Sequence, residues 1–80
     1  MKQSNLTLND ATRQAAKLAG KYSIADNVSA LVYVDGDKVF VRSSRDVRPE
    51  NTIIYCVAQR WNDKSVELRF SGAQSEWVTL

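Results

Sequence analysis

The chain contains no histidine. This absence removes Ser-His-Asp and Cys-His catalysis, imidazole acid–base chemistry and imidazole metal ligation. The single cysteine, Cys56, can form no intrachain disulfide and is too few for a structural zinc site or an iron–sulfur cluster. A small secreted domain usually needs disulfides or a metal, so we expect a reducing, cytoplasmic location and neither metal nor cofactor.

Linker-forming residues and long apolar runs are also scarce. Three glycines and one proline in 80 residues leave no low-complexity linker, and we expect one domain over residues 1–80 with residues 1–5 frayed. No apolar run approaches the roughly 20 residues of a membrane span, and residues 1–5 lead into no signal-peptide-like segment. The 44% apolar and 25% charged residues predict a globular chain without a membrane partner.

Catalytic motifs are missing as well. The sequence has no glycine-rich phosphate loop, nucleophile elbow or Walker motif, so we expect it not to be an enzyme. Cys56 lies between Tyr55 and Val57 with no base near it, which predicts a buried, inert thiol. Asp35-Gly36-Asp37 lacks the other ligands of a calcium loop and is better explained as a turn.

An amphipathic helix is predicted over residues 7–19. Leu8, Ala11, Ala15 and Leu18 recur at steps of three and four, which gives one apolar stripe. Thr7 is placed to cap the start of this helix, and Gly20 is placed to end it.

A β-hairpin is predicted over residues 29–42. Asp35-Gly36 separates two apolar runs, and a two-residue turn there would pair Leu31 with Phe40 and Val32 with Val39. Residues 43–51 form a polar loop. Further along, Val66, Leu68 and Phe70 alternate with polar residues as in a half-buried strand, and residues 77–80 form a last strand.

Residues 52–61 are ambiguous. Their β-branched and aromatic content favours a strand, but their apolar residues also fit one helix face that could begin near Pro49. We therefore predict an α+β fold, an N-terminal helix followed by a curled four- to five-stranded antiparallel sheet. The alternative is the order α-β-β-α-β-β with residues 50–61 helical.

The predicted hairpin is apolar on both faces. Leu31, Tyr33 and Phe40 lie on one side and a set of valines on the other, and one short helix cannot cover both. We expect the sheet either to curl into a small barrel or to bury its second face against another chain, by default in a homodimer.

Two functions are compatible with these features. The first is a non-catalytic protein-binding module that acts by steric contact, such as a small bacterial or phage regulator or inhibitor. Tryptophan and arginine dominate interface hot spots, so Trp61, Arg60 and Trp77 are the candidate partner-binding residues.

The second function is binding of RNA or single-stranded nucleic acid. Arg42, Arg45, Arg48 and Arg60 would contact phosphates while Tyr55 stacks on a base. Interleaved acidic residues and a net charge of only +2 disfavour it. A helix followed by five short strands, with a hairpin spanning Val28 to Val41, is similar to the element order of Sm-like RNA-binding rings, and this resemblance implies RNA binding on a small barrel.

Overall fold

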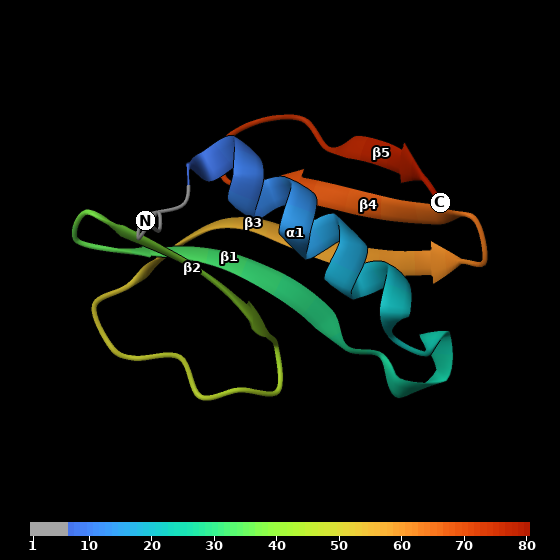
Figure 1. Ribbon diagram of the computed structural model, residues 1–80, viewed down its shortest axis with the longest axis horizontal. Helices are drawn as coiled ribbons and strands as arrows, with labels where there is room; N and C mark the ends of the chain where they lie inside the picture. Colours follow the sequence, from blue (N-terminus) through green and yellow to red (C-terminus); the bar gives the residue numbers. More distant parts are fainter. Residues whose placement is uncertain (1–6) are drawn as a thin grey trace, which may run out of the picture.

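The computed structural model describes residues 7–80 and shows one long helix and a five-stranded sheet (Figure 1). The elements are α1 (Leu8–Lys21), a 3-10 helix η1 (Ile24–Asp26), β1 (Ser29–Asp35), β2 (Lys38–Ser43), β3 (Ile53–Asn62), β4 (Ser65–Phe70) and β5 (Glu76–Thr79). Every neighbouring pair of strands in the order β2-β1-β3-β4-β5 is antiparallel. The predicted α+β class is confirmed, while the expected fraying of residues 1–5 lies outside the described residues.

Helix α1 begins as predicted. Thr7 has extended backbone angles, and its hydroxyl accepts a hydrogen bond of 3.0 Å from the amide of Asp10. This contact satisfies one of the amide groups that the first helical turn leaves without an intrahelical partner.

The predicted end of the helix is wrong. The helix continues through Gly20 to Lys21, and the extended residue Tyr22 caps it by donating its amide to the Ala19 carbonyl over 3.1 Å. A Cβ atom added at Gly20 would lie 3.1 Å from Cδ2 of Leu80. Glycine at this position therefore lets the end of the chain pack against the helix and does not supply a left-handed cap.

The buried face of α1 consists of alanines. Leu8 from the predicted stripe is 37% exposed and Leu18 is only partly buried. The helix residues with the lowest exposure are Ala11, Ala15, Ala16 and Ala19. They join a core cluster whose sheet members are Ala30, Val32, Cys56, Ala58, Val66 and Leu68. Small side chains on both layers bring the helix close to the middle of the sheet.

The hairpin forms in a register two residues away from the predicted one. Tyr33 pairs with Phe40 and Val34 with Val39, and the turn residues are Gly36 and Asp37. Of the two turn residues only Gly36 has a positive φ, 64°, which fits a type II′ turn rather than the expected type I′. Because the slip is an even number of residues, each side chain keeps its predicted face.

The helical alternative for residues 50–61 is wrong. Strand β3 is the central strand, hydrogen-bonded to β1 on one side and β4 on the other. The ladder to β1 shifts after the pair Val32–Cys56, so that the next pair is Tyr33–Ile54 and Tyr55 is skipped. Pairing on both sides satisfies the backbone of β3, and this long-range gain outweighs a local helical pattern.

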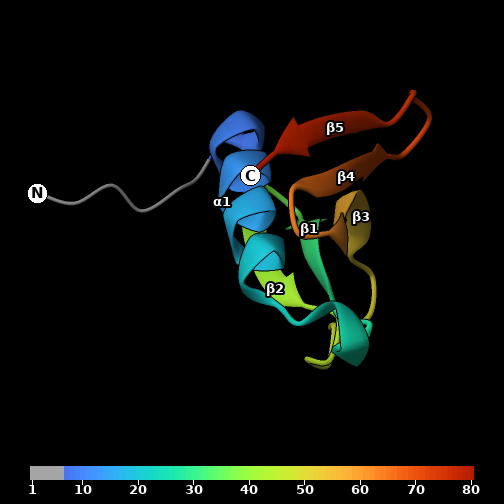
Figure 2. The same cartoon turned by 90° about the vertical axis from the view of Figure 1, so that its right-hand side faces the viewer.

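The two faces of the sheet differ in what covers them. Helix α1 packs against β1, β2, β3 and β4 on one face (Figure 2). The sheet is not closed, because β2 and β5 remain its two edges, so the small barrel is not formed. Within residues 7–80, no helix is long and apolar enough to cross a membrane.

We expect Thr7→Ala to lower the free energy of unfolding by about 1 kcal/mol, because the Asp10 amide loses its acceptor. Urea denaturation measures this change. Thr7→Asp is the matched control, since its carboxylate can accept the same bond. Equal destabilisation by both substitutions would contradict the capping role.

Candidate functional site

Arg60 holds the C-terminal end of α1 on the sheet. Its Nη1 donates to the carbonyls of Gly20 and Tyr22, each over 3.0 Å, and its Nε donates to the carbonyl of Asn62 over 3.2 Å. Its side chain is 21% exposed. A cation here suits the negative end of the helix dipole, so the contacts make Arg60 a structural residue.

Trp61 and Trp77 lie on the face of the sheet opposite α1. Their shared neighbour is Glu67, whose Oε1 accepts a bond of 2.8 Å from Nε1 of Trp61 and which pairs with Trp77 across β4 and β5. The neighbours of Glu67 on β4, Val66 and Leu68, are buried toward the helix, which directs Glu67 to the other side. Trp61 is 47% exposed and Trp77 is 60% exposed.

A chain of polar contacts fixes the indole of Trp61. Arg69 Nη1 lies 3.8 Å from the Glu67 carboxylate, and Arg69 Nη2 donates to Oε1 of Gln59 over 2.9 Å. Gln59 in turn donates to the side chain of Asn27 over 3.3 Å. The Glu67 side chain, only 16% exposed, is thereby held between a cation and an indole.

The same face is apolar toward β1 and β2. Tyr33 and Phe40 are cross-strand neighbours with ring centroids 5.5 Å apart, and the Arg42 guanidinium lies 5.3 Å from the Phe40 ring centroid. We call this surface the open face. The ladder registers assign to it Leu31, Tyr33, Phe40, Arg42, Ile54, Val57, Gln59, Glu67, Arg69 and Trp77. The bond to Glu67 adds Trp61, which the ladder skips.

The residues predicted to bind nucleic acid do not converge. Arg42 belongs to the open face, whereas Arg45 and Arg48 lie in the exposed loop between β2 and β3. Arg60 is engaged at the helix end, and Tyr55 lies on the helix side of the sheet. The partner-binding set is also divided, because Arg60 points away from the face that carries Trp61 and Trp77.

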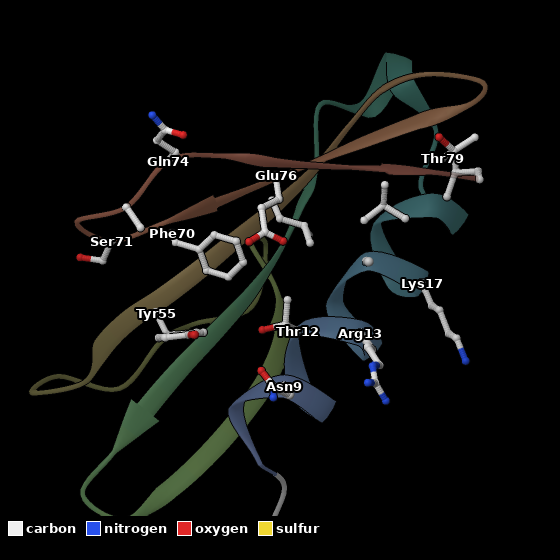
Figure 3. A pocket seen from close by; sticks show the side chains of 15 residues that line it. Asn9, Thr12, Arg13, Lys17, Tyr55, Phe70, Ser71, Gln74, Glu76 and Thr79 are labelled. Atoms are coloured by element: carbon white, nitrogen blue, oxygen red, sulfur yellow. The ribbon is translucent and has the colours of Figure 1, made fainter.

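A cleft between α1 and the β4–β5 hairpin was not predicted. It has a volume of about 700 Å³ (Figure 3). Tyr55 and Phe70 form one end of it, with ring centroids 5.7 Å apart and planes at 74°. No periodicity indicates it, because Tyr55 reaches the helix side only through the ladder shift in β3. Its lining residues are Asn9, Thr12, Arg13, Ala16, Lys17, Tyr55, Leu68, Phe70, Ser71, Ala73, Gln74, Glu76, Val78, Thr79 and Leu80.

Cys56 is fully buried in the core cluster, as predicted. Burial, and secondarily the negative charge of Glu76, raise the pKa of its thiol from 9.0 to about 11. The thiolate is the reactive form, so this position is unsuited to nucleophilic chemistry. In the described part of the chain, no three Cys, Asp or Glu residues lie together as a metal site would require.

Comparison with protein-family models, with curated proteins and with solved structures finds no match to this chain.

We expect Arg60→Ala to lower the free energy of unfolding by about 2 kcal/mol, because two helix-end carbonyls lose a charged donor. Arg48→Ala, in the exposed loop, is the control and should change stability by less than about 0.5 kcal/mol. Urea denaturation compares the two variants. Equal stabilities would show that Arg60 is not the anchor of the helix end.

The raised pKa of Cys56 gives a second prediction. The thiol is neutral in both states well below pH 9. As the pH rises through 9 it ionises first in the unfolded chain, so stability falls as the pH approaches 11. By pH 11 the protein should lose about 2 kcal/mol more than Cys56→Ala, which lacks the thiol and is otherwise identical. Parallel pH profiles of the two proteins would contradict the shift.

Proposed function

We propose that this chain is a non-catalytic protein-binding module that contacts its partner through the open face. The observation that carries the proposal is the exposure of Trp61 and Trp77 together, on the face that α1 does not cover. Exposed aromatic side chains that lie close together on one surface are a usual mark of a protein interface.

The open face has the layout of an interface. Leu31, Phe40 and Val57 supply apolar area on its β1–β3 side, and the two tryptophans supply large rigid side chains at the other end. The indole of Trp61 is already oriented by Glu67, so ordering it on binding costs little conformational entropy. These features support an anchor site that is formed before the partner arrives.

Charge indicates the kind of protein that would fit. Arg42 lies at one side of the face, over the Phe40 ring, and no ion pair among residues 7–80 engages it. A partner with an apolar patch bordered by carboxylates would complement this charge. Such a module acts sterically by covering a surface that its partner needs, as a regulator or an inhibitor does.

Nucleic acid is the weaker candidate for the same face. The Glu67 carboxylate lies between the two exposed tryptophans, where stacked bases would bring their phosphates close. A negative charge at that point opposes a polyanion, although Arg69 offsets part of it.

We expect Trp61→Ala and Trp77→Ala each to weaken binding of a purified partner by about 30-fold, as hot-spot residues do. Leu8→Ala removes an exposed apolar side chain from the helix side and should leave affinity unchanged. Titration calorimetry measures the affinities, and circular dichroism confirms that each variant is folded. Full affinity in both tryptophan variants would overturn the proposal.

The molar mass in solution tests two other possible partners of the open face, nucleic acid and a second copy of the chain. Light scattering at low salt with a mixed-sequence RNA oligonucleotide should leave the mass unchanged. A mass increase with RNA that disappears at higher salt would assign the face to nucleic acid. A homodimer that Trp77→Ala dissociates would identify a second copy as the partner.

A further inference from the structure

The cleft on the helix side has the composition of a site for a positively charged organic group. Tyr55 and Phe70 form an aromatic corner, and Glu76 extends from β5 toward it (Figure 3). Glu76 pairs with Leu68 across β4 and β5, and Phe70 is two residues further along β4 on the same face. The register therefore brings the carboxylate next to the ring of Phe70.

The Glu76 carboxylate forms no ion pair with any lysine or arginine of residues 7–80. The three ion pairs in this part of the chain engage Asp10, Asp63 and Glu67. Arg13 and Lys17 line the helix wall of the cleft, but Figure 3 shows both side chains pointing away from Glu76. Arg13 also lies 3.8 Å from the Asp10 carboxylate. Negative charge is thus concentrated at the aromatic end of the cleft.

The other groups around this corner suit an ammonium ion on an aliphatic stem. The Thr12 hydroxyl donates to the Leu8 carbonyl over 2.8 Å, which leaves its lone pairs free to accept from a bound N–H group. Leu68, Val78 and Ala16 provide apolar lining for a stem. The volume of about 700 Å³ lies within the range of small-molecule sites.

We propose that this cleft binds an aliphatic ammonium group, with the cation placed between Glu76 and the rings of Tyr55 and Phe70. Aromatic faces attract cations through their quadrupole, and a carboxylate in the same corner adds a direct charge interaction. The ammonium group can belong to a free alkylamine or to a lysine side chain. The cleft and the open face lie on opposite sides of the sheet, so this site is independent of the protein-binding proposal.

Nuclear magnetic resonance titration of the full chain with butylammonium tests the proposal. We expect shifts of the amide signals of Tyr55, Phe70 and Glu76. Glu76→Gln should weaken binding about tenfold or more, and Phe70→Leu should weaken it severalfold. Trp77→Ala is the matched control, because it changes the adjacent residue on β5, whose side chain points to the open face. It should bind butylammonium as the wild-type protein does.

Two further ligands make the charge requirement specific. Butanol has the same stem without the charge, and butyrate carries the opposite charge, so both should bind at least tenfold more weakly than butylammonium. Equal binding of butanol, tighter binding of butyrate or an unaffected Glu76→Gln variant would overturn the proposal. A lysine-containing peptide that binds more tightly than butylammonium would assign the site to a protein side chain, and equal affinity would assign it to a free amine.

Discussion

The close packing of alanine on alanine between α1 and the sheet is the constraint on which the rest of the structure depends. Ala11, Ala15 and Ala19 are fully buried against a sheet surface in which Ala30 and Ala58 are also fully buried. Short side chains at the contact bring the helix axis near the strands. The helix covers only the face it touches, and on the opposite face Trp61 and Trp77 are exposed while Tyr33 is buried.

Both candidate sites follow from this arrangement. Tyr55, Leu68 and Phe70 line the sheet side of the cleft, and residues of α1 line its other side. At the C-terminal end of α1, Arg60 on β3 binds the carbonyls of Gly20 and Tyr22. The direction of the helix is therefore set by the alanine packing and by this anchor. The open face keeps Trp61 and Trp77 exposed because nothing in the sheet curls over them.

Local patterns in the sequence predicted the elements but not their long-range relations. The cap at Thr7, the hairpin and the alternating strand β4 depend on neighbours a few residues apart, and all three form. Whether β3 is a strand or a helix depends on its pairing with two strands distant in sequence. Its own residues therefore did not exclude a helix. The role of Gly20 depends on Leu80, sixty positions away, and no local rule contains that contact.

In the candidate sites, too, local features were predictable from the sequence and long-range placement was not. Trp61 and Trp77 could be proposed as partner-binding residues from residue type alone, because tryptophan is enriched in interface hot spots. Arg60 was included with them by adjacency in sequence, whereas alternation along β3 sends it to the helix side. The cleft was missed because the skipped residue in β3 moves Tyr55 to a face that simple alternation would not give it.

The central claim is that the open face is uncovered in the free protein, and tryptophan fluorescence tests it most directly. Both tryptophans lie on that face, so their emission reports on it alone. The structure predicts emission typical of water-exposed indole and efficient quenching by acrylamide, unchanged between dilute and concentrated solutions. Blue-shifted emission that resists quenching in concentrated protein and reverts on dilution would contradict it, because another copy would then cover the face.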